Sequence, residues 1–147
     1  MDKNGFLISL SESEQTDFGR VDFDEQSQPQ KVFSAIWALE SQVNNGGFAQ
    51  YFESSDGETA NFAPTALRAI EAHKCADIVQ RALRAVSTDP LPASADDRER
   101  VLSGLPETAR EQLEALDQEF FTYPDNLTEL LFAYVAARPD TFGRIPE

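Results

Sequence analysis

The sequence predicts an all-α protein, a compact globular bundle of about six to seven helices. Apolar residues recur at helical spacing along most of the chain, and helix-ending and helix-starting residues separate these stretches. The hydrophobic fraction of 41%, with 11 Phe, is enough for a core. A length of 147 residues fits one domain. We expect that domain at residues 29–147, with residues 1–28 as an N-terminal arm or short elements packed on it.

The arm carries weak secondary-structure signals. Residues 6–10 are mostly apolar, but five residues do not distinguish a strand from a helix. The segment SESE at residues 11–14 is typical of a helix N-cap followed by acids. A polar stretch, predicted as an arm or loop, follows and holds four acidic residues: Asp17, Asp22, Asp24 and Glu25.

Residues 29–43 are predicted to form the first long helix. One face carries an apolar stripe: Val32, Ile36, Leu39 and Val43. Glu40 falls inside the apolar sector when the helix is plotted at 100° per residue. A carboxylate in that position needs a partner or a place at the edge of the core. We expect the edge position, with Arg68 or Arg81 nearby.

This helix should end in a sharp corner. Asn44 and Asn45 tolerate the left-handed conformation, and Gly46-Gly47 supply the positive-φ freedom that ends a helix. Aromatic residues at i, i+3 and i+4 then define one face of the next helix: Phe48, Tyr51 and Phe52.

The corner resembles the signature of the DNA mimic protein nineteen family: VNNGGFAQYF at residues 43–52, followed by ESSDG at residues 53–57. The resemblance is dense over residues 32–86 and weak over the N-terminal arm and the C-terminal third. The motif residues are expected to have a structural role: Asn44, Asn45, Gly46, Gly47, Phe48, Gln50, Tyr51 and Phe52.

Further helices are predicted beyond the corner. Pro64 suits the first turn of one helix, and a break near residues 73–74 precedes another, on which Cys75 takes the apolar side as a buried structural thiol. A short helix at residues 95–102 should pair its acids with Arg98 and Arg100. The helix at residues 126–138 is apolar around most of its circumference, so we expect it to be the central, most buried helix.

The predicted helix at residues 106–121 has an acidic face opposite its apolar face. The acids follow helical spacing: Glu107, Glu111, Glu114 and Asp117. Like charges at this spacing cost a few tenths of a kcal/mol per pair, about 0.2–0.5, in helix stability. This cost makes a binding role for the face more attractive.

The formal net charge is −14, from 26 acidic and 12 basic residues. Such a charge disfavours direct binding to nucleic acid or to an anionic membrane. The single cysteine excludes an internal disulfide and fits a reducing compartment. No apolar run is long enough to span a bilayer, and no signal peptide is recognisable, so we expect a cytoplasmic protein.

The sequence predicts neither an enzyme nor a cofactor or metal site. His73 is the only histidine, which excludes a multi-histidine metal centre within this chain. No phosphate-binding loop, dinucleotide fingerprint or calcium loop is present.

The family resemblance implies that the protein is a DNA mimic, which presents carboxylates in place of phosphates and occupies the DNA-binding face of a basic partner. The candidate binding residues are the four named acids of the predicted helix 106–121, with the four named acids of the arm as a second row: Glu107, Glu111, Glu114 and Asp117, then Asp17, Asp22, Asp24 and Glu25. An immunity or antitoxin protein that neutralises a basic toxin, such as a nuclease, would show the same acidic face. A small-molecule site is the second alternative, with a pocket lined by Trp37, Phe48, Tyr51 and Phe52. The oligomeric state stays open, with a homodimer among the options.

Overall fold

The computed structural model describes residues 2–145, which contain helices and no strands. The all-α prediction is confirmed. Eight α-helices occur in this range, because the arm forms one helix and the residues after Arg138 add a short one. In chain order, with two 3-10 turns labelled η, the elements are α1 (Lys3–Glu12), η1 (Phe23–Glu25), α2 (Gln28–Glu53), η2 (Ser55–Thr59), α3 (Ala63–Ala69), α4 (His73–Val86), α5 (Ala95–Ser103), α6 (Glu107–Phe121), α7 (Leu127–Ala136) and α8 (Pro139–Phe142). None of the helices in residues 2–145 is both long and apolar enough to cross a membrane.

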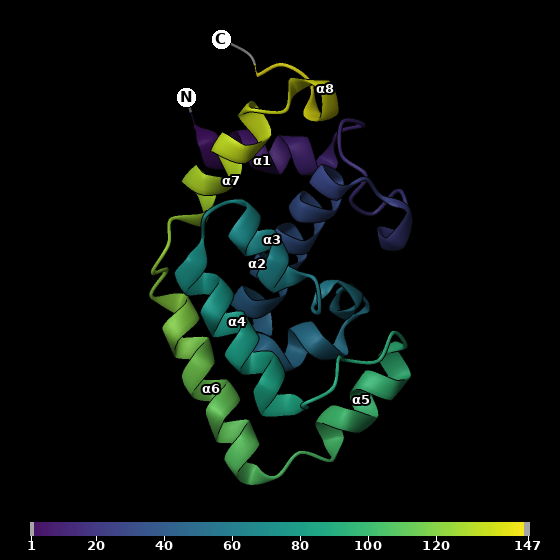
Figure 1. The fold of residues 1–147 in the computed structure, drawn as a ribbon, viewed down its shortest axis with the longest axis vertical. Helices are drawn as coiled ribbons and strands as arrows, with labels where there is room; N and C mark the ends of the chain where they lie inside the picture. The colour runs from purple at the N-terminus through teal and green to yellow at the C-terminus, as the bar shows by residue number, and fades with distance from the viewer. Residues whose placement is uncertain (1, 146–147) are drawn as a thin grey trace.

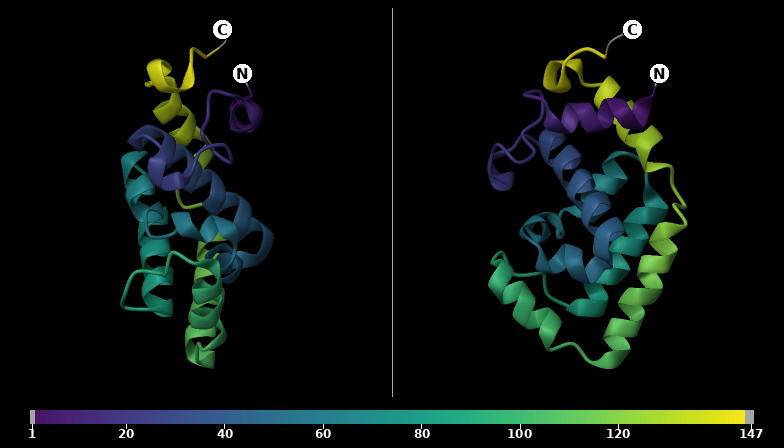
Figure 2. Two further views of the ribbon diagram at one scale, coloured as in Figure 1. Left: turned by 90° about the vertical axis from the view of Figure 1, so that its right-hand side faces the viewer. Right: turned by 180° about the vertical axis from the view of Figure 1, so that it is seen from behind.

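Helix α2 lies at the centre of the molecule, where α3, α5 and α6 pack against it (Figure 1). The prediction that the last long helix is central is wrong. Helix α7 lies at one end of the molecule, against α1 and α8 (Figures 1 and 2). Phe6 of α1 meets Phe132 of α7 edge to face, with ring centroids 5.6 Å apart. Because α1 and α8 both cover α7, an apolar circumference does not require a central position.

The predicted corner is present within α2. Gly46 and Gly47 leave helical geometry, and Gly47 has φ 81° and ψ −179°. A positive φ of this size is strained for any residue with a side chain, which explains glycine at position 47. The helix continues through Asn44 and Asn45, which are exposed, so these residues do not supply the break.

Beyond the corner, α4 and α6 lie side by side and α5 lies against the end of α2 (Figures 1 and 2). Helix α5 lies within one residue of its predicted range, 95–102; the Ser94 side chain accepts the Asp97 N–H at its start, and Gly104 follows its last turn. Pro64 lies in the first turn of α3, and the break before α4 falls at residues 70–72, where Glu71 has φ 69°.

Arg98 of α5 departs from its predicted role in surface ion pairs, because its side chain is buried with 1% exposure. The guanidinium donates hydrogen bonds to four backbone carbonyls, at 2.7–3.0 Å: Phe52, Ser54, Pro92 and Ala93. Two of these carbonyls lie at the C-terminal end of α2, where the helix dipole favours a cation. Arg98 therefore joins α5 to the end of the central helix. Arg100 does form the predicted type of surface pair, with Asp97 at 3.0 Å.

Candidate partner-binding surface

Three of the four acids predicted on α6 form an exposed stripe. Glu107, Glu111 and Glu114 are exposed to solvent, and α6 itself lies at the edge of the molecule (Figure 1). Side chains three or four residues apart on a helix lie about 5–6 Å from each other. Within the part of the chain that the structure describes, none of the three takes part in an ion pair. We call these three residues the α6 stripe.

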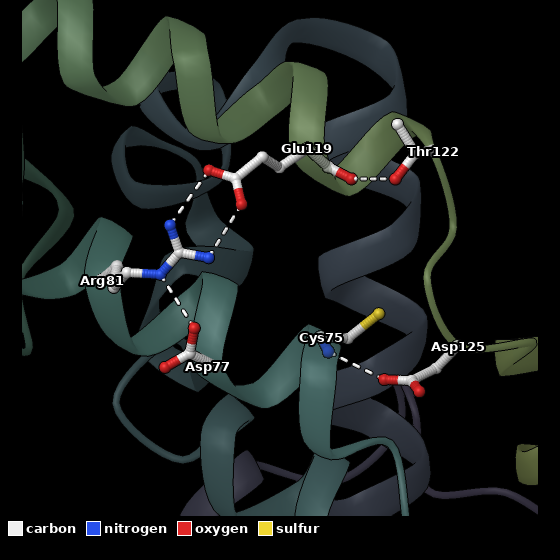
Figure 3. A network of polar contacts seen from close by, with 6 residues as sticks. All are labelled: Cys75, Asp77, Arg81, Glu119, Thr122 and Asp125. Carbon is white, nitrogen blue, oxygen red and sulfur yellow. Dashed lines mark hydrogen bonds and ion pairs between the residues drawn. The ribbon is translucent and has the colours of Figure 1, made fainter.

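Two arginines of α4 and α6 are engaged with other groups. Arg110 donates to the carbonyl of Leu102 at 2.7 Å. Arg81 of α4 binds both carboxylate oxygens of Glu119 on the inner side of α6, at 2.9 and 3.0 Å, and its Nε reaches Asp77 at 2.9 Å (Figure 3). Asp77 and Arg81 are four residues apart on α4, the spacing at which helical side chains pair. Neither guanidinium forms an ion pair with the α6 stripe, so the negative charge of the stripe is not paired by them.

Asp117, the fourth acid predicted for this face, has a different position. It is half-buried, and its Oδ1 accepts the backbone N–H of Phe48 at 2.8 Å. Burial raises the pKa of this carboxyl, and the charge of Glu114 adds to the rise, whereas the Phe48 N–H opposes it. The contact caps the helical segment that begins after Gly47, so Asp117 supports the corner.

The structure does not bring the acids of the N-terminal arm to the α6 stripe. Asp22, Asp24 and Glu25 are exposed around η1, on the opposite edge of the molecule from α6 (Figures 1 and 2). Asp17 is half-buried, and its backbone carbonyl accepts the N–H groups of Arg20 and Val21 in a turn. The two predicted rows therefore do not form one continuous path.

Two acids that were not predicted as binding residues lie near the acids of η1. Asp56 and Glu58 of η2 line a hollow of about 260 Å³ together with Asp22. The pKa of Glu58 is raised, first by burial and then by the charge of Asp24, with smaller contributions from Asp22 and Asp56, whereas Arg98 lowers it. This shift indicates that carboxylates converge here. Residues 22–24 and 56–58 are far apart in sequence, and no spacing pattern connects them.

The partner expected for Glu40 is corrected by the structure. Its Oε2 accepts a hydrogen bond from the hydroxyl of Tyr123 at 3.2 Å, and neither Arg68 nor Arg81 forms an ion pair with it. The same hydroxyl accepts the side-chain N–H of Asn44 at 2.7 Å. Burial raises the pKa of Glu40, and the Tyr123 hydrogen bond opposes the rise. The edge position was predicted, but a tyrosine after α6 takes the place of the arginine.

A comparison with protein-family models identifies the family of the chain. A family model described as DMP19-like protein matches residues 24–138, well over half of the chain. The chain belongs to the DMP19-like family. The match confirms the resemblance to the DNA mimic protein nineteen family and extends beyond the segment 32–86, where the resemblance is densest. No curated protein and no solved structure matches the chain.

In this DMP19-like chain the aromatic residues of the motif fill the core. Phe48, Tyr51 and Phe52 have 0% exposure, and the Tyr51 hydroxyl lies 2.6 Å from that of Thr59. These three rings cannot line an open pocket, so the predicted small-molecule pocket is wrong in its residues. Trp37 alone of the four borders a cavity, which is described below.

Two further side chains are of reactive types, the thiol of Cys75 and the imidazole of His73. Cys75 is buried and free, as predicted, and burial raises its pKa to about 12. Its backbone N–H donates to Asp125 at 2.8 Å, at the start of α4 (Figure 3). His73 is exposed and lies 2.9 Å from Glu71. Across residues 2–145, no His, Cys, Asp and Glu side chains are grouped as a metal site would require.

Proposed function

We propose that this protein is a DNA mimic, whose α6 stripe occupies the phosphate-binding face of a basic DNA-binding protein. One observation carries the proposal: three exposed glutamates line up on one helix, and none of them forms an ion pair with a described residue. Membership of the DMP19-like family supports the same function.

The charge spacing suits this role. B-form DNA carries about one charge per 1.7 Å of its axis when both strands are counted. Carboxylates about 5–6 Å apart along α6 resemble neighbouring phosphates on one strand. Such a field speeds association with a cationic protein and makes binding sensitive to salt. The acids around η1 and η2 form a separate face and are a second candidate contact, not an extension of the α6 stripe.

Charge reversal tests the proposal. The triple variant Glu107→Lys, Glu111→Lys and Glu114→Lys raises the formal net charge from −14 by six units to −8. It should lose the basic partner that the wild-type protein captures from native lysate at low salt. A matched control reverses three other exposed acids, Asp89, Asp96 and Glu99, with the same change in net charge. Retained capture by the α6 variant would remove α6 from the binding surface.

The identity of the captured protein separates mimicry from immunity. For a mimic, the captured protein binds DNA, and added duplex DNA should displace it competitively. For an immunity protein, the captured protein is a toxin whose activity is blocked in the complex. A partner that duplex DNA does not displace would contradict DNA mimicry.

A further inference from the structure

A small cavity lies where α1, α2 and α7 meet, and we call it the Glu40 cavity. Its volume is about 190 Å³. The polar and aromatic side chains that line it are Asn4, Trp37, Glu40, Ser41, Asn44 and Thr128. Pockets that take a metabolite or drug-sized ligand measure about 300–1,000 Å³. The Glu40 cavity is therefore sized for the end of one side chain.

The cavity offers hydrogen-bond acceptors that the chain itself leaves unused. Glu40 Oε2 is bonded to Tyr123, but Oε1 has no hydrogen-bond partner among the described residues. Among the described residues, every fully buried side-chain oxygen or nitrogen has a hydrogen-bond partner. Because Oε1 of Glu40 has none, this oxygen is accessible to solvent. Asn44 uses its N–H toward Tyr123, which leaves its carbonyl oxygen available. The hydroxyls of Ser41 and Thr128 form no hydrogen bond with residues 2–145.

This set of groups selects a cation that is rich in donors. Glu40 is partly buried and forms no ion pair with a described residue, although the folded chain removes much of its water. A guanidinium carries five N–H donors and no acceptor, and it also stacks on aromatic rings. Trp37 provides the ring, and its stacking on Phe33, with centroids 5.5 Å apart and planes at 9°, fixes the orientation of the indole.

The position of the cavity connects it with the α6 stripe. Tyr123, which holds Glu40, comes two residues after the end of α6. Phe121, at the end of the same helix, is 41% exposed. The Glu40 cavity therefore lies near the C-terminal end of α6, the end toward which the α6 stripe runs. Proteins that bind DNA present arginine side chains on the contacting face.

We infer that the Glu40 cavity binds the guanidinium group of an arginine side chain presented by the basic partner. The source of the arginine rests on the proposed function, whereas the preference for a guanidinium rests on the cavity itself. Arginine at this point would anchor the register of a partner that the α6 stripe attracts over a longer range.

A ligand titration tests the preference. The probe is Nα-acetyl-L-arginine N-methylamide, whose blocked ends imitate a residue within a chain. The sequence has one tryptophan, so one indole resonance in the NMR spectrum reports on Trp37. The probe should shift this resonance and the side-chain amide of Asn44 saturably, with a dissociation constant in the millimolar range. The citrulline analogue has the same shape without the charge and should not saturate. Equal binding of the two probes, or none of either, would overturn the inference.

Two variants test the residues. Glu40→Gln keeps an oxygen for Tyr123 but removes the charge, and it should weaken binding of the arginine probe by about tenfold or more. Ser41→Leu changes an exposed position on α2 and should block the cavity without affecting the core. Circular dichroism checks that both variants are folded. Binding as tight as that of the wild-type protein in both folded variants would remove the cavity from the interaction.

Further measurements identify the source of the guanidinium group. They also distinguish a failure of the cavity inference from a failure of the α6 proposal. Agmatine is a free guanidinium compound without a backbone, and binding more than about tenfold tighter than the capped arginine would identify a free small molecule as the ligand. The α6 triple variant should lose the partner and still bind the capped arginine. If that variant keeps the partner while the arginine probe binds the wild-type protein, the α6 proposal fails and the cavity inference survives. If Glu40→Gln abolishes binding of the arginine probe but partner capture is unchanged, the partner does not supply the arginine.

Discussion

The carboxylate of Asp117 accepts the backbone N–H of Phe48 at 2.8 Å, although the two residues are 69 positions apart in the sequence. Phe48 is the first residue after the break in α2, so its N–H lacks a partner within the preceding helix. Asp117 thus performs, from another helix, the role that an N-cap side chain normally performs from the preceding residue.

Removing this cap should destabilise the fold. Asp117→Ala is expected to lower the free energy of unfolding by about 1–2 kcal/mol, as measured by urea denaturation. Asp117→Asn keeps an acceptor oxygen and should lose less. Glu114→Ala, on the exposed side of the same helix, should change stability by less than about 0.5 kcal/mol. Equal stability of Asp117→Ala and the wild-type protein would argue that the cap contributes nothing.

A side chain at Gly47 should be poorly tolerated. Gly47 has φ 81°, and an added Cβ would collide with the carboxylate of Asp117. Gly47→Ala is expected to lower the free energy of unfolding by about 1–3 kcal/mol. Gly104 has a negative φ and no atom within 3.4 Å of an added Cβ, so Gly104→Ala is the matched control and should be nearly neutral. Thermal unfolding of the two variants compares them directly, and similar melting temperatures would contradict the strain at position 47.

Arg98 should be irreplaceable by lysine. Its guanidinium binds four carbonyls in a buried site, and an ammonium group cannot reproduce that planar arrangement. Arg98→Lys is expected to cost about 3 kcal/mol or more, because several buried carbonyls lose their partners. Arg100→Lys, at a position 79% exposed, should change stability by less than about 0.5 kcal/mol. Chemical denaturation measures the free energy of unfolding of both variants. A small loss of stability in Arg98→Lys would show that water replaces the guanidinium as the partner of the carbonyls.

The stability of the wild-type protein should depend on pH through Glu40. Burial raises the pKa of Glu40 in the folded state above the ordinary value of 4.5. At neutral pH the charged form is therefore unfavourable in the fold, and Glu40→Gln should be more stable than the wild-type protein. As the pH falls through the raised pKa toward 4.5, folded Glu40 takes up a proton before unfolded Glu40 does. The advantage of the variant should shrink across that window.

Glu119→Gln provides a control of opposite sign. Arg81 lowers the pKa of Glu119, chiefly through the hydrogen bonds between them. The wild-type protein should therefore be the more stable one at neutral pH, and its advantage should be lost as the pH falls below the ordinary value of 4.5 through the lowered pKa. Urea denaturation of both variants between neutral and acidic pH measures the two trends. Parallel trends in the two variants would contradict these assignments.

Local signals in the sequence predicted much of the fold. Gly46-Gly47, Pro64 and the aromatic face after Gly47 act within a few residues, so the sequence spacing predicts their effects. The α6 stripe was found in the same way. The central position predicted for α7 was wrong because its apolar circumference indicates that the helix is buried but not which elements bury it.

Contacts between distant residues were not predictable. The carboxylate of Asp117 and that of Glu114 have the same chemistry and the same helical pattern, yet one caps the corner and the other faces solvent. The difference arises from the position of α6 relative to Gly47, which only tertiary packing determines. The convergence of Asp24 with Glu58 and the contact of Glu40 with Tyr123 have the same origin.

The buried thiol of Cys75 has a practical consequence. Because a thiolate is the reactive species and this thiol has a pKa of about 12, reagents that modify cysteine at neutral pH should leave it untouched. A cysteine introduced at position 111 would then be the single labelled site in the molecule. A photo-crosslinker attached there would covalently trap whichever protein rests on that helix inside the cell.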